Sequence, residues 1–273
     1  MSITDLNSQA VTVGRSLWTD SDSHDLIDVT PSPYLRRPSI VGRFVGFALF
    51  LLCVPVIAVL VLIVRSTSRG PGLYKQVRVG KDGKIFVMYK IRSMIQNAEM
   101  GTGPVWTQDH NDPRITTIGA FLRKSHLDEL PQLLNVARGE MALFGPRPER
   151  PELVHVLADN IPGYLNRLAV PPGITGLAQI NLPPDSDLES VRRKILLDTE
   201  YITTASAMLE FRMFLWTGLR LVGVPASFAT AFFGLDRDVE PVSASQVGPV
   251  TIDDVVSMQR NVEQQETMAS NHS

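Results

Sequence analysis

Apolar side chains gather most densely in one run near the start of the chain. Residues 44–64 carry no charge, and a helix needs about 20 such residues to cross the hydrocarbon core of a bilayer. Pro55 lies in the middle of this run. A proline at that position removes a backbone hydrogen bond and kinks the helix. The pattern therefore predicts a bent membrane helix.

Basic residues flank this run on both sides, at Arg36, Arg37 and Arg43 before it and at Arg65, Arg69, Lys75 and Arg78 after it. A helix that passes straight through a membrane usually has its basic residues concentrated on one side. We therefore predict a re-entrant anchor over residues 39–66, a helix that bends at Pro55 and returns to the face it entered from. A straight span with an incidental proline is the alternative, and the sequence leaves it open.

Shorter patterns after the run predict a helix-rich α/β domain over residues 67–222. Residues 73–79 and 84–90 have the composition of strands, and the glycine-containing segment 80–83 between them is a hairpin signal. Apolar residues at helical spacing predict helices over 118–124, 125–136 and most of 187–222. Gly139 is a good stop for the second helix. Residues 101–113 and 170–176 are expected to be loops.

The two ends of the chain differ from this domain in composition. Residues 1–38 are polar, rich in Ser and Asp and without sustained periodicity, so we predict a disordered extension. The last segment, 223–273, begins with a small, apolar stretch that we expect to seek a surface. From Leu235 onward it is polar, and we predict a disordered tail.

Composition narrows the class of protein. The chain has 273 residues, 26 of them basic and 28 acidic, for a formal net charge of -2. Proteins that bind nucleic acid usually have more basic than acidic residues, so we expect no nucleic-acid partner. The single cysteine, Cys53, lies inside the apolar run, so no intramolecular disulfide can form. That fits a reducing, cytosolic side of the membrane.

An Asp-Glu pair lies at the start of the predicted helix 125–136. Ser125 precedes Asp128 by three residues, a capping arrangement that places Asp128 in the first helical turn. Free N–H groups and the helix dipole favour negative charge there, so we expect Asp128 to be ionised, as a nucleophile must be. Asp128 and Glu129 flank the leucine stripe of this helix and could reach one small site. Acidic residues in a first turn are also ordinary helix stabilisers, so the pair alone does not distinguish a catalytic site from a structural role.

Several basic residues strengthen the case, namely Lys90, Arg92, Arg123 and Arg147. Arg147 stands between Pro146 and Pro148, which restrict its backbone, and the planar fork of arginine suits phosphate oxygens. A rigid loop also loses little entropy when a ligand binds. No Walker loop or Rossmann glycine pattern appears in the sequence, so a nucleotide would have to be held differently.

At this point the motifs resemble a known family, the bacterial sugar transferases that act as monotopic polyprenyl-phosphate phosphoglycosyl transferases. The resemblance runs from about Ser39 to Thr217. It is carried by GPGLYKQVRVG (70–80), YKIRSM (89–94), DPRIT (112–116), LDELPQLLNV (127–136), GPRPE (145–149) and PGITGLAQ (172–179). There are two departures. Val54 precedes Pro55 where the family usually has serine, and the pair Leu209-Glu210 stands where relatives often carry aspartate.

The resemblance implies a two-step phosphoryl transfer. The aspartate of such a pair attacks the β-phosphate of a UDP-sugar, and UMP leaves. Polyprenyl (undecaprenyl) phosphate then takes the phospho-sugar from the carboxylate, which initiates an exopolysaccharide, capsule, O-antigen or glycoprotein glycan. Asp128 would be the nucleophile, Glu129 its catalytic partner, and both would be associated with Mg²⁺. The residues expected to bind phosphate or nucleotide are Arg147, Arg123, Lys90, Arg92, Pro146, Pro148 and Gln179.

The same resemblance implies a lipid bilayer as partner, at the cytoplasmic face of the bacterial inner membrane. Two other readings remain open, a non-catalytic membrane scaffold and a hydrolase that cleaves nucleotide sugars with water. The sequence does not specify the sugar. It is compatible with a homo-oligomer without requiring one.

Overall fold

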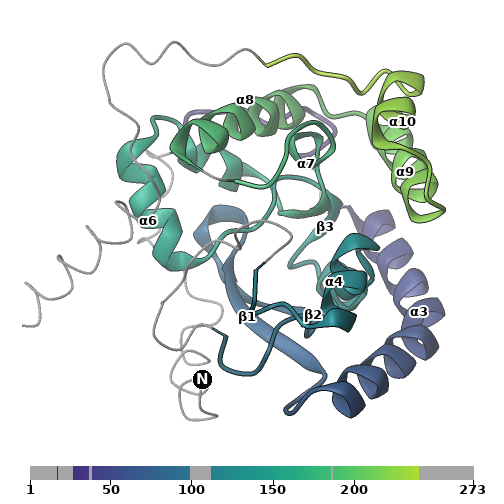
Figure 1. The fold of residues 1–273 in the computed structure, drawn as a ribbon. Coiled ribbons are helices and arrows are strands. Elements are labelled where there is room, and N and C mark those ends of the chain that lie inside the picture. Colours follow the sequence, from purple (N-terminus) through teal and green to yellow (C-terminus); the bar gives the residue numbers. More distant parts are fainter. Residues whose placement is uncertain (1–16, 18–26, 37–38, 99–111, 186, 240–273) are drawn as a thin grey trace, which may run out of the picture.

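The computed structural model describes residues 17, 27–36, 39–98, 112–185 and 187–239 (Figure 1). Among them the helices are α3 (Ile40–Thr67), α4 (Thr117–Lys124), α5 (Leu133–Arg138), α6 (Pro151–Asn160), α7 (Leu177–Asn181), α8 (Leu188–Thr204), α9 (Ala207–Leu221) and α10 (Ala226–Phe232). Short 3₁₀ helices are η1 (Lys81–Gly83), η2 (Leu127–Gln132) and η3 (Tyr164–Ala169). The strands are β1 (Leu73–Val79), β2 (Ile85–Ile91), β3 (Ala142–Phe144) and β4 (Gly173–Thr175). The predicted helix-rich α/β class with a short hairpin is confirmed.

The hairpin forms where the sequence predicts it. Strands β1 and β2 pair antiparallel, in register from Leu73 opposite Ile91 to Val79 opposite Ile85. Asp82 in the connection has φ 54°, a left-handed conformation that short polar side chains tolerate. Phe86 and Met88 on β2 are buried in a small core cluster. The hairpin thus has one face fixed to the domain, which sets the direction of the side chains on β2.

A second sheet lies where the sequence predicts only a loop. Strands β3 and β4 pair in parallel, with Ala142 opposite Gly173 and Phe144 opposite Thr175. The loop prediction for residues 170–176 is therefore wrong over 173–175. Each strand has three residues, too few for an alternating pattern, and the pairing joins segments far apart in sequence. A Cβ atom on Gly173 would collide with the Gly145 backbone, so only glycine permits this close approach.

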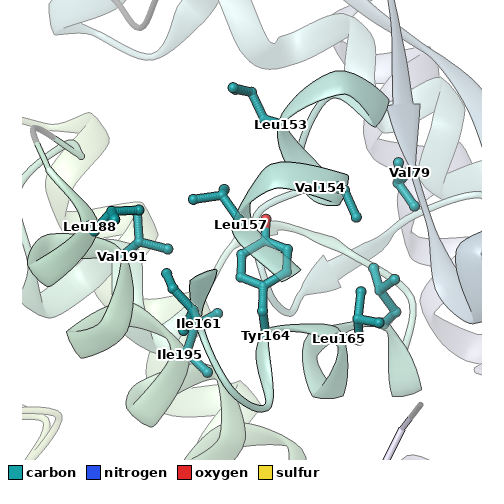
Figure 2. Packing of buried hydrophobic residues seen from close by; sticks show 11 residues of the cluster. Val79, Leu153, Val154, Leu157, Ile161, Tyr164, Leu165, Leu188, Val191 and Ile195 are labelled. Carbon is teal, nitrogen blue, oxygen red and sulfur yellow. The ribbon is translucent and has the colours of Figure 1, made fainter. Parts of the chain in front are cut away.

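The largest cluster of buried side chains joins α6, η3 and α8 (Figure 2). In Figure 2, Leu157 of α6 and Tyr164 of η3 pack beside Val191 and Ile195 of α8. Full burial of side chains of this kind contributes about 1.5–3 kcal/mol each. The cluster therefore gives the domain a rigid frame behind the residues that could carry chemistry.

The apolar run forms one helix, α3, that is long and apolar enough to cross a membrane, and its most apolar window is almost wholly uncovered. Both of its ends contact the same domain. Near the start, the Arg43 side chain donates to the Ala137 carbonyl oxygen. Near the end, Val64 is buried in a cluster with Ile91 and Leu122. Figure 1 shows the ribbon of α3 bent as it follows one side of the domain.

The predicted disorder of residues 1–38 is wrong for residues 27–36, which pack on the domain. The Ser32 N–H donates to the Ile202 carbonyl oxygen (2.9 Å), and the Tyr34 hydroxyl donates to Glu210 (2.8 Å). Ile27, Val29 and Leu35 pack against a buried cluster. These few apolar residues are diluted by polar neighbours, so the average composition conceals them. Most of this extension lies outside the described residues.

The helices predicted over 187–222 are confirmed as α8 and α9, with a break before Ser206, which caps α9. The apolar stretch that follows forms α10. The predicted disorder after Leu235 fails at its first residues, since Leu235 is fully buried and Arg237 pairs with Glu200. The rest of that tail, and most of the predicted loop 101–113, lie outside the described residues.

Candidate active site

The Asp-Glu pair lies on a tighter turn than predicted. The expected single helix over 125–136 is instead η2 followed by α5, with Pro131 inside η2. Proline has no N–H to donate, so a regular α-helix cannot form through this position without losing a bond. The predicted ending is correct, because Gly139 with φ 78° closes α5.

The predicted cap at Ser125 is wrong. Helix α4 ends at Lys124, and the Ser125 hydroxyl donates back to the Phe121 and Leu122 carbonyl oxygens. His126, at φ 56°, then starts η2 without a side-chain cap. Sequence spacing marked Ser125 as the start of one helix, whereas it closes the helix before.

Asp128 is buried, with only 7% of its surface exposed. Burial raises the pKa of its carboxyl group above the ordinary value, and the nearby charges of Lys90, Arg147 and Arg123 offset only part of that effect. This direction is opposite to the one expected from a helix terminus. Asp128 is therefore a carboxyl group whose ionised form is disfavoured by burial.

One carboxylate oxygen of Glu129 accepts hydrogen bonds from two cationic side chains. Its Oε1 accepts hydrogen bonds from Lys90 Nζ (3.0 Å) on β2 and from Arg147 Nη2 (2.8 Å) in the loop after β3. Burial alone would raise the pKa of Glu129, but the charges of Arg147 and Lys90 outweigh it and hold that pKa well below its usual range. We call Lys90, Glu129 and Arg147 the front cluster. Three segments distant in sequence meet there.

The loop that carries Arg147 is fixed along its backbone. Pro146 and Pro148 are buried, whereas Arg147 is exposed. The carbonyl oxygens of residues 146, 147 and 148 accept hydrogen bonds, respectively from Gly173 N (2.9 Å), Arg167 Nη2 (2.9 Å) and Arg78 Nη1 (3.0 Å). Such a loop holds the Arg147 side chain in place before any ligand binds, which lowers the entropic cost of binding.

A second charged group lies behind this loop and was missed from the sequence. Arg167 pairs with Asp198 (Nη2 to Oδ2, 3.0 Å) and donates from Nη1 to the Tyr164 hydroxyl (3.0 Å). We call these three residues the rear cluster. Burial raises the pKa of Asp198 to about 6, although the charge of Arg167 opposes this. A charged residue on the apolar stripe of a predicted helix, as Asp198 is on α8, was the available signal.

Three other predicted site residues have three different surroundings. Arg123 is half-buried at the end of α4, close enough for its charge to lower the pKa of Asp128. Arg92 is not directed to the pair, because its guanidinium donates to Ser68 and to the Arg69 carbonyl oxygen after α3. Gln179 on α7 has a buried side-chain amide, and neither of its polar atoms has a partner among the described residues.

A family model described as "Bacterial sugar transferase" matches residues 38–223, more than half of the chain. The chain belongs to the bacterial sugar transferase family. The predicted resemblance is thereby confirmed. Two parts of the fold lie outside the matched region, the segment 27–36 before it and helix α10 after it.

Curated relatives of this bacterial sugar transferase are named for transfer to undecaprenyl phosphate. The Escherichia coli protein "UDP-glucose:undecaprenyl-phosphate glucose-1-phosphate transferase" is 40% identical over 174 residues, 60% of this chain and 36% of that protein. The Aeromonas hydrophila protein "UDP-N-acetylgalactosamine-undecaprenyl-phosphate N-acetylgalactosaminephosphotransferase" is 37% identical over 201 residues, 72% of this chain and 46% of that protein. The chain thus spans less than half the length of these two relatives.

Among the described residues, the expected Mg²⁺ would fit a site that the protein shares with substrate. Within the described residues, no group of three His, Cys, Asp or Glu side chains gathers to hold a metal. Mg²⁺ is usually held by one or two carboxylates together with substrate phosphates and water. Asp128 and Glu129, adjacent on η2, supply that number of carboxylates.

Proposed function

We propose that this chain transfers a sugar 1-phosphate from a UDP-sugar to polyprenyl (undecaprenyl) phosphate, releasing UMP and initiating a cell-surface glycan. The observation that carries the proposal is the front cluster beside Asp128, in which Lys90 and Arg147 converge on one oxygen of Glu129. Family membership and the names of the relatives supply the class of donor and acceptor.

Asp128 is the group we assign to the covalent step. One of its carboxylate oxygens bonds to the β-phosphorus of the UDP-sugar, and the bond from that phosphorus to the bridging oxygen breaks, so UMP leaves with the electron pair. A phosphate oxygen of the polyprenyl phosphate then bonds to the same phosphorus, and the aspartate carboxylate is released. Two transfers through a covalent intermediate replace one more difficult transfer.

The front cluster prepares this site electrostatically. Glu129 holds Lys90 and Arg147 in place, and the carboxylates of Glu129 and Asp128 together balance the charges of these two cations. Arg123 adds a positive charge beyond this balance, which suits the oxygens of a diphosphate, whose charge grows on the leaving group as the bond breaks. Mg²⁺, held by Asp128, Glu129 and the diphosphate, would neutralise further charge there.

The supporting residues have smaller roles in this proposal. Pro146 and Pro148 fix the loop that presents Arg147, whereas the buried amide of Gln179 has no role assigned in this proposal. Arg92 is left out, because its two terminal guanidinium nitrogens donate to Ser68 and to the Arg69 carbonyl oxygen.

We also propose that α3 is re-entrant and holds the domain at the cytoplasmic face of the inner membrane. A straight helix of 28 residues would span about 42 Å and place its ends on opposite sides of a bilayer. Contacts of both Arg43 and Val64 with one domain support a bend at Pro55 instead. In a Cys53→Ser background, labelling of single cysteines placed at Ser39 and Ser68 should find both on the cytoplasmic side. Ser39 on the outer side would contradict the re-entrant form.

The test of the function is a UMP-release assay. Purified full chain in nanodiscs receives a panel of UDP-sugars with Mg²⁺, with and without polyprenyl phosphate. We expect sustained UMP release with at least one sugar only when the lipid is present. Release at full rate without lipid would identify a hydrolase, and no release with any sugar would favour a scaffold.

A further inference from the structure

Asn135 is a buried amide between α5 and β2, with 0% of its surface exposed. Its Oδ1 accepts a hydrogen bond from the Tyr89 N–H (3.2 Å). Its Nδ2 donates to the Val87 carbonyl oxygen (2.7 Å) and to Glu140 Oε2 (2.7 Å). A side-chain amide has two hydrogens to donate, and both are used here. Because an ionised carboxylate only accepts hydrogen bonds, Glu140 also fixes which end of the amide faces it.

These bonds act on the free edge of β2. Among the described strands only β1 pairs with β2, so the backbone groups on the other edge of β2 need partners from elsewhere. Asn135 provides both a donor and an acceptor there, at Val87 and Tyr89. Helix α5 is thereby joined to β2 at two backbone positions.

The bonds of Asn135 connect the two elements that carry Lys90 and Glu129 of the front cluster. Lys90 follows Tyr89 on β2, and its Nζ lies 3.0 Å from Glu129 Oε1. Glu129 belongs to η2, which continues directly into α5. A displacement of β2 relative to α5 would therefore move Lys90 relative to Glu129.

Apolar packing between the same two elements does not set their relative position as sharply. Val136 of α5 lies in one buried cluster with Phe86 and Met88 of β2. Such burial stabilises the contact but has no direction, whereas hydrogen bonds weaken steeply when their geometry is wrong. The apolar cluster can therefore keep the fold together, while the amide of Asn135 fixes where β2 lies along α5.

We propose that Asn135 is a positioning residue for the phosphoryl transfer, and that its two hydrogen bonds to β2 set the place of Lys90 beside the Asp-Glu pair. Preorganised charges stabilise a transition state without reorganisation during the reaction. A misplacement of about 1 Å can slow a reaction by about 10²-fold. The role in catalysis rests on the proposed function, whereas the connection between α5 and β2 does not.

The connection is tested without the reaction, by comparison of Asn135→Ala with Asn181→Ala. The Asn181 amide on α7 also makes three bonds to backbone, donating to the Leu177 and Leu235 carbonyl oxygens and accepting from the Arg237 N–H. None of these partners belongs to β2 or to the front cluster. Both variants should lower the midpoint of thermal unfolding. Only Asn135→Ala should speed amide hydrogen exchange in the peptide that covers β2, and unchanged exchange there would overturn the inference whatever reaction the protein catalyses.

Kinetics then separate positioning from a merely structural role. In glycolipid formation by full chain in nanodiscs, Asn135→Ala should lower kcat by about 10- to 100-fold. KM for the UDP-sugar should stay within about 2-fold, as for an interaction made in the transition state. Asn181→Ala should keep its kcat. In a Lys90→Gln background, Asn135→Ala should cause little further loss, because the cation that it positions is already gone.

Two results would overturn the positioning role. One is a full additional loss of kcat for Asn135→Ala in the Lys90→Gln background, and the other is an equal loss of kcat in Asn181→Ala. Where Asn135→Ala does not fold, Glu140→Ala is the second variant, since it removes the partner that orients the amide and neither bond to β2. It should show the same changes at smaller size, and unchanged exchange in β2 would again contradict the inference.

Discussion

The front cluster and the rear cluster lie on two sides of one loop and differ in how their charges balance. In front, Lys90 and Arg147 share the single carboxylate oxygen of Glu129, and the Arg147 side chain keeps 47% of its surface exposed. Behind, Arg167 and Asp198 pair one to one, with side chains exposed by 10% and 2%. With Arg123 beside it, the front has positive charge left for a ligand, whereas the rear pair is neutral and almost fully buried.

This difference separates two tasks that charged residues perform in one fold. A buried, balanced pair holds structure, and removal of one member leaves the other charge without a partner. An open, unbalanced cluster binds anions at a modest cost to the fold. Arg147 takes part in both, since its side chain faces Glu129 while its carbonyl oxygen accepts from Arg167. Substitutions in the front cluster should therefore mainly reduce activity, whereas substitutions in the rear cluster should mainly reduce stability.

The largest effect is expected at Asp128. Asp128→Asn keeps the shape of the side chain but removes the attacking oxygen, so kcat should fall by at least about 10³-fold, as removal of a nucleophile does in other enzymes. The melting temperature should not fall, because a buried charge is lost. Glycolipid formation and thermal unfolding in nanodiscs measure the two quantities. Asp159→Asn on the exposed face of α6 is the control, and full activity of Asp128→Asn would exclude this nucleophile.

Arg167→Ala should mainly reduce stability. It leaves Asp198 buried without its cation, which typically destabilises a protein by about 3–5 kcal/mol. The double variant Arg167→Met with Asp198→Leu removes both charges and should recover most of that loss. Denaturant unfolding of the two variants is the measurement. Equal destabilisation of the single and double variants would mean that the rear cluster is not a structural pair.

Arg147→Lys should show the reverse pattern. The charge remains but the planar fork is lost, so kcat/KM should fall by about 10²-fold, which is about 2.7 kcal/mol of transition-state stabilisation. Stability should change by less than about 0.5 kcal/mol, as for other exposed side chains. Arg138→Lys, an exposed arginine that contacts Tyr89, is the matched control for the same substitution. A large loss of stability in Arg147→Lys without a loss of activity would mean that the front cluster has the same structural role as the rear cluster.

The smallest effect concerns pH. Burial raises the pKa of Asp128 and the charge of Lys90 partly opposes it, so the acid limb of kcat/KM should lie above the ordinary aspartate range. The reactive form is the ionised one, so activity falls as pH drops through this pKa. Lys90→Gln removes the opposing charge and should move the limb further upward. The exposed Lys75→Gln should leave the limb in place, and an unmoved limb in Lys90→Gln would contradict the assignment.

Patterns of neighbouring residues in the sequence predict much of the secondary structure. The hairpin and the helices α4, α8 and α9 depend on neighbouring residues, so alternation and helical spacing predict them well. Asp128, Glu129, Lys90 and Arg147 were found in the same way, through residue type and the family motifs, and the structure brings all four together.

Long-range contacts explain what the sequence did not give. Two contacts join segments that are distant in the sequence, the pairing of β3 with β4 and the hydrogen bond from Arg167 to the Arg147 carbonyl oxygen. No pattern of neighbouring residues predicts such contacts. Arg92 was assigned to the site by residue type, yet backbone oxygens after α3 engage it. Ser125 was read as the start of a helix because spacing does not show where the previous helix ends.

The covalent role of Asp128 is the central claim, and intact-mass measurement tests it most directly. Purified chain is mixed with its UDP-sugar and Mg²⁺ without polyprenyl phosphate, quenched in acid within the first turnover and analysed by mass spectrometry. We predict a mass increase equal to one sugar phosphate, located on the peptide that contains Asp128 and absent from Asp128→Asn. Formation of glycolipid by the same preparation, with no adduct at any time after mixing, would contradict the account.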